Sequence, residues 1–399
     1  MSPRLTHPSV CVLAALTAIS VALAACASAA APSTPVPAPP PTAVPPAPTP
    51  AAPAAPAQSA ARPAGSPVPA AAYDERAVAD FYRGKTLRLV VGLAAGGGFD
   101  TIYRLWGRYA GKYIPGQPTI VVDNMTGAGG LVAANYLYNS APRDGTTMGT
   151  MDILVTILGQ AAGAKGIELD GNKFNWIGNP GDETPPVCAL RADLGFKTFD
   201  DVLKSGKELV LGASGRGNVF YATPRVVQAA TGAKFKLIDG YPGNPAVRLA
   251  VDNRELDGAC WGLASMRSTA ANWFEGDPPP MQIVLQGGKA PYKDLPDVPL
   301  LRSYVTDPSL LGLVDVLENA LFHTYLAAMP PGVPEERVAA MRDAFLKTWK
   351  DPELQQEMAK TQFRFSPVSG EETERVVKQL LAMPPEEGKR IGQVFGLID

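Results

Sequence analysis

The sequence from residue 73 onward predicts an α/β fold of two lobes. Three of its segments share one pattern: an apolar run of strand length, a glycine-rich turn and then a helical pattern. Strands that alternate with helices are typical of mainly parallel sheets covered by helices on both faces. The segment 73–399 is also too long for one ordinary hydrophobic core. We therefore expect two lobes, each with a mainly parallel sheet flanked by helices.

The three repeated units place a turn after each of three strands. In open α/β sheets, ligands bind beyond the carboxyl ends of the strands, where such turns lie. The strands are expected at 86–93, 119–124 and 208–212, the turns at 94–99, 125–130 and 213–218, and the helices at 100–113, up to about 140 and at 219–231.

The N-terminus has the features of a signal peptide, expected at residues 1–25. Arg4 supplies a positive charge, an apolar run extends from Val10 to Ala25, and no stop-transfer segment follows. The residues Leu23-Ala24-Ala25-Cys26 resemble a bacterial lipobox, in which the cysteine thiol is diacylated and becomes the new N-terminus. Several acyl chains hold a protein on a bilayer far more firmly than one chain does. We expect lipidation at Cys26, and the alternative is a plain signal peptide with an incidental cysteine.

Residues 26–72 are expected to form a linker behind this anchor. From Ala31 to about Ala72 the chain is rich in Pro, Ala, Ser and Thr, and Arg62 is the only charged residue up to Ala70. Such a segment buries too little apolar surface to fold and contains too much proline for a helix. An extended tether of about 45 residues at ~3.1 Å each would reach roughly 140 Å. The alternative role is that of a ligand for a proline-recognising domain.

The charge and cysteine content exclude several classes of protein. The chain has 36 basic and 38 acidic residues, and no basic patch with interleaved aromatic residues indicates nucleic-acid binding. Cys11 leaves with the signal peptide and Cys26 is expected to carry lipid, so Cys188 and Cys260 remain. In an oxidising compartment this pair can form a disulfide, or each thiol can be buried as a small apolar group. Two thiols without a partner histidine make a poor metal site, and we expect neither metal nor cofactor.

The three glycine-rich turns point to the binding of an anion. Each turn places small residues before a helix N-terminus, where unpaired backbone N–H groups point outward and the helix dipole contributes roughly half a positive charge. Glycine, including Gly127 and Gly129 of the second turn, allows a carboxylate or phosphate to approach the backbone closely. One such loop alone is explained equally well as a tight turn. Converging helix ends, in contrast, make an anion pocket that needs no Lys or Arg.

The motifs of the main enzyme classes are incomplete. Residues 212–216 follow a strand and precede a helix like a nucleophile elbow, but Arg216 stands where that motif needs glycine. Beyond the signal peptide the only histidine is His323, in a segment that looks like a strand rather than a catalytic loop. Residues 127–130 lack the third glycine or alanine of the dinucleotide fingerprint, and no Walker lysine follows any turn. We therefore expect no enzyme.

A series of short motifs after Tyr73 carries a family resemblance. In their order they resemble the substrate-binding proteins of tripartite tricarboxylate transporters, often called the Bug family, over nearly all of the remaining chain. The motifs are VGLAAGGGFD at 91–100, NMTGAGG at 124–130, APRDGT at 141–146, GASGRG at 212–217, YPG at 241–243, LDGAC at 256–260, DLPDVP at 294–299, MPPGVP at 329–334 and KDPE at 350–353.

The resemblance implies a periplasmic binding protein of the type II-like, Venus-flytrap kind. Such a protein closes on a carboxylate and delivers it to a membrane transporter without catalysis. In the family the ligand carboxylate is held largely by main-chain amides and hydroxyls, with bridging waters. The corresponding residues here are Ala95, Gly96, Gly97, Gly98 and Phe99 in the first lobe, and Ser214, Gly215, Arg216, Gly217 and Asn218 in the second.

The resemblance also underlies our expectations about the domain layout, the location and the partners of the protein. We expect lobe 1 at about 73–185 and 262–399, and lobe 2 at about 186–261. Cys188 and Cys260 would lie near the passages between the lobes. We expect a monomer in the periplasm or on the outer face of the cytoplasmic membrane, attached to the membrane only by its lipid anchor. A sensory or scavenging carboxylate-binding module without a dedicated transporter remains the alternative.

Several side chains near the loops have two interpretations. Asp100 either caps its helix or pairs with Arg104, which we favour over ligand contact because a carboxylate repels an anionic ligand. Arg216 either faces a second ligand carboxylate or is a solvated loop arginine. Large aromatic side chains either line the cleft or belong to the core. The aromatic candidates are Phe99, Phe220, Tyr221 and Trp261.

Overall fold

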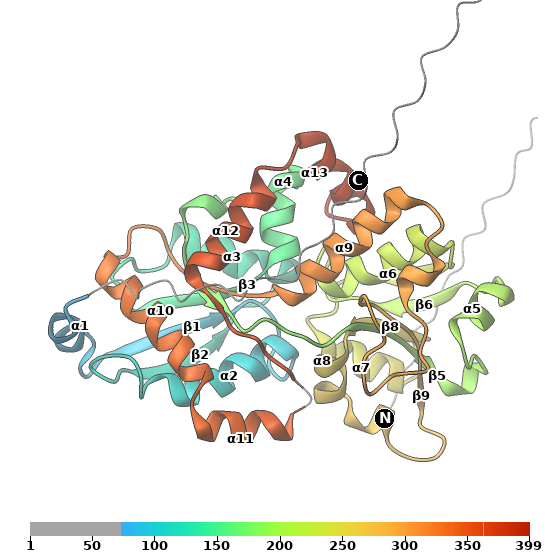
Figure 1. Cartoon of the computed structure of the whole chain (residues 1–399), viewed down its shortest axis with the longest axis horizontal. Coiled ribbons are helices and arrows are strands. Elements are labelled where there is room, and N and C mark those ends of the chain that lie inside the picture. The colour runs from blue at the N-terminus through green and yellow to red at the C-terminus, as the bar shows by residue number, and fades with distance from the viewer. Residues whose placement is uncertain (1–72, 362) are drawn as a thin grey trace, which may run out of the picture. The chain divides into compact units, whose positions relative to one another are not determined.

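Two β-sheets divide the described part of the chain into two lobes (Figure 1). The computed structural model describes residues 73–361 and 363–399, which lie within one compact unit, Pro67–Asp399, with its own hydrophobic core. The expected signal peptide, the lipidation site at Cys26 and the expected linker lie outside the described residues. Among the helices of the described ranges, none combines the length and apolar character needed to cross a membrane. The two-lobed α/β fold class is confirmed.

The first lobe is built on a six-stranded sheet. Its strands are β1 (Thr86–Val91), β2 (Thr119–Asn124), β3 (Thr147–Asp152), β4 (Asn175–Asn179), β10 (Tyr325–Met329) and β11 (Val368–Ser369). They lie in the order β11-β4-β10-β3-β1-β2. β1 is parallel to β2 and β3, whereas β10 is antiparallel to β3 and β4, and β11 is antiparallel to β4.

Helices cover both faces of this sheet (Figure 1). They are α1 (Glu75–Tyr82), α2 (Gly98–Ala110), α3 (Leu131–Asn139), α4 (Gly159–Ala162), α10 (Glu335–Trp349), α11 (Pro352–Lys360), α12 (Gly370–Leu381) and α13 (Pro385–Phe395). α2 and α10 pack together against one face, while α3 and α12 contact the other. α2 shows why these segments are helical: Ile102, Leu105, Trp106 and Tyr109 recur every three or four residues and form one buried stripe.

The second lobe contains a five-stranded sheet in which parallel and antiparallel pairs are mixed. Its strands are β5 (Pro186–Arg191), β6 (Leu209–Gly212), β7 (Phe235–Ile238), β8 (Gly258–Gly262) and β9 (Met281–Gln286). They lie in the order β7-β6-β8-β5-β9. The helices of this lobe are α5 (Phe199–Ser205), α6 (Val219–Thr231), α7 (Asn244–Asp252), α8 (Leu263–Thr269) and α9 (Pro308–Phe322).

The structure corrects three expectations about these elements. The sheets are mixed rather than mainly parallel, because β10 and β5 insert antiparallel to their neighbours. The second lobe does not end near residue 261: β9 pairs with β5 and α9 packs against α6, so it continues to about residue 322. His323 does not lie in a strand, since it is the C-cap residue of α9.

A disulfide links Cys188 on β5 to Cys260 on β8. The two residues are directly opposite each other in the antiparallel pair, and both are buried. The bond therefore joins neighbouring strands inside the second lobe, although the sequence resemblance placed it near the passages between the lobes. It closes a loop of 72 residues, for which the chain-entropy model gives a stabilisation of about 4 kcal/mol.

We predict that the compact unit, residues 67–399, contains no free thiol when it is prepared without reductant. Alkylation of the denatured protein should then leave the intact mass unchanged, whereas prior reduction should add two alkyl groups. Reduction should also lower the midpoint of thermal unfolding, because it frees the loop between the cysteines. Two alkylated thiols in the unreduced sample would contradict the bond.

Candidate functional site

The first glycine loop meets the second lobe across the space between the sheets. Gly97 is the N-cap residue of α2, and a Cβ atom placed on it would lie 4.0 Å from Cδ of Pro245 at the start of α7. A Cβ atom on Gly243, the N-cap residue of α7, would lie 3.0 Å from Cβ of Ala94. The N-termini of α2 and α7, from opposite lobes, therefore contact one another.

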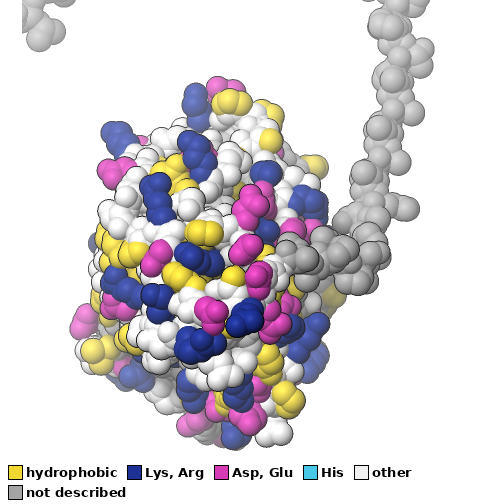
Figure 2. Space-filling model, turned by 90° about the vertical axis from the view of Figure 1, so that its left-hand side faces the viewer, with side chains coloured by type: hydrophobic (Ala, Val, Ile, Leu, Met, Phe, Trp, Pro, Cys, Tyr) yellow, Lys and Arg dark blue, Asp and Glu magenta, His cyan; other side chains and the backbone are white. Residues whose placement is uncertain are grey.

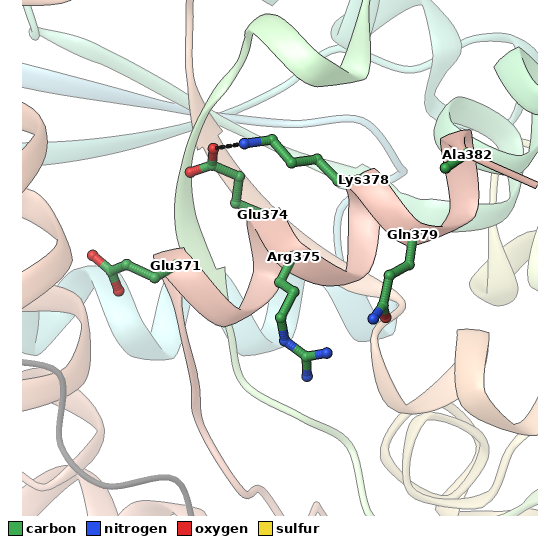
Figure 3. Close-up of a pocket in the computed structure, with 6 residues that line it drawn as sticks. All are labelled: Glu371, Glu374, Arg375, Lys378, Gln379 and Ala382. Atoms are coloured by element: carbon green, nitrogen blue, oxygen red, sulfur yellow. Dashed lines mark hydrogen bonds and ion pairs between the residues drawn. The ribbon is translucent and has the colours of Figure 1, made fainter.

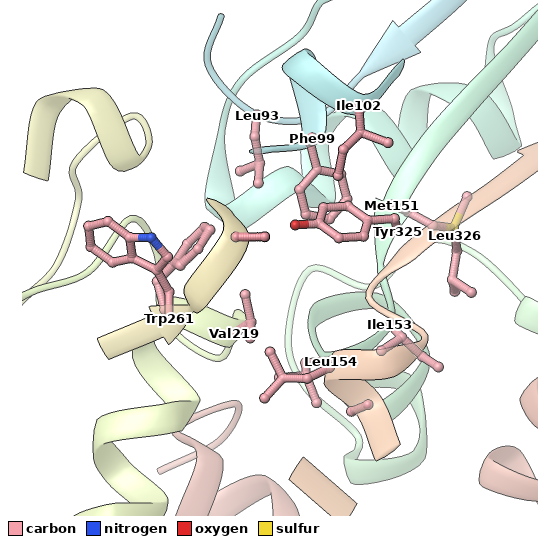
Figure 4. Close-up of a cluster of buried hydrophobic side chains, with 14 of the residues drawn as sticks. Leu93, Phe99, Ile102, Met151, Ile153, Leu154, Val219, Trp261, Tyr325 and Leu326 are labelled. Atoms are coloured by element: carbon pink, nitrogen blue, oxygen red, sulfur yellow. The ribbon is translucent and has the colours of Figure 1, made fainter. Parts of the chain in front are cut away.

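A group of hydroxyl and amide side chains adjoins this contact. A Cβ atom on Gly98 would overlap Oγ of Ser265 on α8 and would lie 3.1 Å from the Tyr325 hydroxyl oxygen. Asn244 donates a hydrogen bond from its amide nitrogen to Ser265 Oγ, 2.9 Å away. Figure 4 shows the Tyr325 hydroxyl directed out of the first lobe toward the second. Gly98 thus marks a place where Ser265 and Tyr325 leave no room for a methyl group.

The second and third glycine loops also meet. A Cβ atom on Gly215 would lie 2.8 Å from the backbone nitrogen of Gly129, and one on Gly129 would lie 3.3 Å from Cβ of Asn218. Gly127 instead faces Val132 of its own loop and helix, and its φ of 141° explains why a glycine stands there. All three turns therefore take part in contacts between the lobes: the first turn meets the start of α7, and the second turn meets the third.

The helix ends at these contacts differ in whether their backbone donors are already satisfied. At α6, the side chain of Asn218 accepts hydrogen bonds from the amides of Phe220 and Tyr221, and Asp152 accepts one from the amide of Val219 at 3.3 Å. At α2 and α7 the N-cap residue is a glycine, and neither makes a side-chain capping hydrogen bond. At α2 the amides of Gly98 and Phe99 therefore stay open to an anion, whereas the donors of α6 are occupied. At α7 the open donor is the amide of Asn244, because Pro245 has no N–H and the amide of Ala246 donates to the Gly243 carbonyl oxygen.

Asp100 has a structural role, as favoured from the sequence. Its carboxylate accepts hydrogen bonds from Nε of Arg104 at 2.8 Å, from the amide of Gly96 at 2.9 Å and from Nδ2 of Asn124 at 2.9 Å. Burial raises the pKa of Asp100, but these hydrogen bonds and the nearby guanidinium outweigh it, so the pKa lies below its usual value. The carboxylate fixes the shape of the first glycine loop.

Three of the candidate side chains lie away from the contact between the lobes. Trp261 is fully buried, packs between Phe220 and Trp273 in the second lobe, and points away from Tyr325 (Figure 4). Arg216 is 63% exposed and pairs with Asp239 and Asp399, which fits a solvated loop arginine. Tyr221 abuts the C-terminal segment, since a Cβ atom on Gly396 would overlap its ring. Phe99, in contrast, packs edge-on against Tyr325 with ring centroids 4.6 Å apart.

The sequence analysis missed two buried carboxyl groups at the contact, Asp152 and Asp182. Asp152 ends β3, and Asp182 lies in the segment that leads from β4 to β5. Burial raises the pKa of each to about 7. Neither forms an ion pair with another described residue. No motif could have revealed them, because their burial depends on which remote segments pack around them.

One surface groove lies elsewhere and has a different character. It follows α12, has a volume of about 530 Å³ and is lined by charged side chains that pair among themselves, such as Glu374 with Lys378 (Figure 3). The face of the first lobe in Figure 2 likewise intersperses Lys and Arg with Asp and Glu. The groove along α12 is lined by no residue of the glycine loops, and we take the contact between the lobes as the candidate site.

Two curated proteins are similar to this chain in sequence, while no protein-family model matches it. A "UPF0065 protein in gbd 5'region" from Cupriavidus necator is 26% identical over 306 residues, which are 73% of this chain and 82% of the relative. A "UPF0065 protein in the TAR-I ttuE-ttuC' intergenic region" from Agrobacterium vitis is 31% identical over 193 residues, which are 45% of this chain and 52% of the relative.

Solved structures of periplasmic binding proteins superimpose on the chain. BugD matches with a TM-score of 0.62 at 18% identity, covering 79% of this chain and 99% of BugD. MatC from Rhodopseudomonas palustris, solved with malate, matches with a TM-score of 0.59 at 20% identity, covering 78% and 99%. An R. palustris protein solved with adipate matches with a TM-score of 0.63 at 15% identity, covering 78% and 97%. The chain therefore has the fold of these periplasmic binding proteins, and the resemblance to the Bug family found in its sequence is confirmed.

Proposed function

We propose that this chain is an extracytoplasmic solute-binding receptor that captures a small organic carboxylate between its lobes and delivers it to a membrane transporter. The observation that carries the proposal is the contact between the uncapped N-termini of α2 and α7. Each helix end carries roughly half a positive charge, so two ends that meet repel each other. A carboxylate between them would accept backbone hydrogen bonds from both lobes and remove this repulsion.

The residues that surround this position suit a small anion. The backbone amides of Gly98 and Phe99 begin α2, and Ser265, which accepts a hydrogen bond from Asn244, adjoins Gly98 from the second lobe. No lysine or arginine is needed, which agrees with the pairing of Arg216 at the surface. We assign the ligand carboxylate to this group, with the second and third glycine loops closing the other side of the site.

The same geometry favours binding over catalysis. Ser214, at the elbow-like turn, accepts a hydrogen bond from Asn218, and its partner is therefore an amide rather than a base. His323 contacts the amide of Asn179 at 3.1 Å inside the first lobe. A serine hydrolase needs these two side chains to be hydrogen-bonded to each other. Both instead serve the local structure of separate lobes.

The proposal includes delivery of the ligand to a membrane transporter and attachment of the receptor to the membrane by a lipid anchor. MatC and the R. palustris adipate protein were solved with dicarboxylates, and the Bug resemblance implies delivery to a transporter. The lipobox-like Leu23–Cys26 and the proline-rich linker would hold the receptor near that partner on the outer side of the membrane.

We predict that a small carboxylate raises the midpoint of thermal unfolding of residues 67–399, and that neutral sugars and nucleotides do not. A ligand at about 100 times its dissociation constant should stabilise the fold by about 2.7 kcal/mol. Differential scanning fluorimetry with a panel of mono- and dicarboxylates, amino acids and sugars measures this shift. Stabilisation by a sugar and by no acid in the panel would refute an anion-binding role.

We also predict that Gly98→Ala weakens ligand binding at least tenfold while leaving the fold of each lobe intact. The added methyl group would overlap Ser265 Oγ and crowd the Tyr325 hydroxyl where the lobes meet. Isothermal titration calorimetry gives the affinity, and far-ultraviolet circular dichroism gives the fold. Gly312→Ala on α9 is the matched control, because its new methyl group would meet nothing within 4 Å apart from its chain neighbours and the backbone of its own helix. Equal affinities for both variants would exclude the first glycine loop from the site.

A further inference from the structure

The helix α13 makes a noncovalent connection between the lobes. Within the described residues the chain passes between the lobes twice, at 180–185 between β4 and β5 and at 323–324 between α9 and β10. These two passages lie side by side, since the amide of Asp182 donates a hydrogen bond to the carbonyl oxygen of Phe322. α13 follows the second passage and packs against α4 of the first lobe and α6 of the second (Figure 1). It therefore joins the lobes at a third place.

On the side of the first lobe, two glycines on one face of α13 allow close contact with α4. A Cβ atom on Gly388 would lie 2.5 Å from the carbonyl oxygen of Ala161, and one on Gly392 would lie 2.5 Å from Cβ of Ala162. Only glycine permits the two backbones to approach this closely. The chain also enters α13 directly from α12, through residues 382–384. α13 is therefore a fixed part of the first lobe.

On the side of the second lobe, Arg225 of α6 binds the C-terminal end of α13. Its Nε donates a hydrogen bond to the carbonyl oxygen of Val394, and its Nη2 donates one to that of Gln393, both at 3.2 Å. The last carbonyl groups of a helix lack partners within the helix and carry partial negative charge, so a guanidinium group is favourable there. Two hydrogen bonds from one half-buried side chain thus connect α6 to α13.

The residues that follow α13 extend this contact to the third glycine loop. Gly396 ends the helix with a φ of 75°, and a Cβ atom on it would overlap the ring of Tyr221 on α6. Leu397 then lies against the loop, because a Cβ atom on Gly217 would lie 2.3 Å from Cδ2 of Leu397. The segment 396–397 therefore contacts the second lobe both at α6 and at the turn before it.

The contacts of α13 with the second lobe are the ones that can break when the lobes separate. α13 is joined covalently to α12 of the first lobe, whereas noncovalent contacts alone join it to the second. Arg390 donates a hydrogen bond to a backbone carbonyl at the start of α9, and Arg216 pairs with Asp399, both at 3.1 Å. These two contacts are exposed, where such interactions contribute little. The attachment to the second lobe therefore depends mainly on the hydrogen bonds of Arg225 and the packing of Leu397.

We propose that α13 and the segment 396–397 form a latch that stabilises the arrangement in which the glycine loops of the two lobes meet. The latch contacts are present in this arrangement. A rotation of the lobes at the two passages shifts α6 relative to α4 and breaks contacts of α13 that bridge them. Contacts that exist in only one of two states shift the equilibrium toward that state. The latch acts without a ligand, so the inference goes beyond the proposed function.

Double electron–electron resonance between two nitroxide labels, one on each lobe, tests the latch. The labels would be attached to residues 67–399 through Gln356→Cys on α11 and Lys204→Cys on α5, both at exposed positions. The native cysteines do not react because they are bonded to each other. Without ligand, Arg225→Ala combined with Leu397→Ala should raise the ratio of separated to joined lobes at least threefold, seen as a gain in the longer distances between the labels.

Two further variants complete the test. Leu397→Ala alone provides an independent variant should the double variant fold poorly by circular dichroism, and it should also increase the population of separated lobes. Lys389→Ala is the matched control on the same helix, because Lys389 is exposed and pairs with Glu386 of α13. It should leave the distances unchanged. Latch variants that show the same distance distribution as the control would overturn the inference, and they would leave the proposed function standing because no ligand is used.

Discussion

The meeting of α2 and α7 at their N-termini is the constraint on which the arrangement of the lobes depends. Helices of opposite lobes point their positive ends at one another, and their N-caps are glycines that provide no side-chain acceptor. Close approach of the lobes also requires two further glycines, since a methyl group on Gly98 or on Gly215 would overlap atoms of the other lobe. The two helix ends can therefore approach each other, but their positive ends repel, and in the proposed function an anion would remove this repulsion.

The third helix end shows how the chain treats the same problem without a ligand. At α6, Asn218 caps the helix and Asp152 reaches across from the first lobe, so two side chains occupy the backbone donors. This difference between α6 and the α2–α7 contact distinguishes the two ends of the proposed site. In the proposed function the ligand anion lies with the open helix ends, because Asp152 already supplies an oxygen to the end of α6.

The sequence predicted those features that local pattern determines. The strand at 119–124 and the helix at 219–231 match the observed bounds, because an apolar run and a capped helical repeat leave little choice. The closeness of the first two glycine loops followed from the rule that turns after parallel strands share one edge of the sheet, whereas the contact with the third loop depends on the packing of the two lobes. The antiparallel pairing of β10 with β3 and of β9 with β5 could not be predicted. Long segments separate the strands of each pair, and no hairpin turn connects them. Likewise, Trp261 belongs to the hydrophobic core because it packs against Phe220 and Trp273. Only the tertiary packing determines this placement.

The account holds that the lobes meet around a bound anion, and small-angle X-ray scattering tests this claim most directly. Residues 67–399 would be measured alone and with a saturating concentration of the acid that stabilises them most. Closure of two lobes on a ligand reduces the radius of gyration, so the account predicts a smaller value in the presence of the acid. A radius of gyration that stays unchanged at saturation would contradict it, because the ligand would then occupy a site that forms without movement of the lobes.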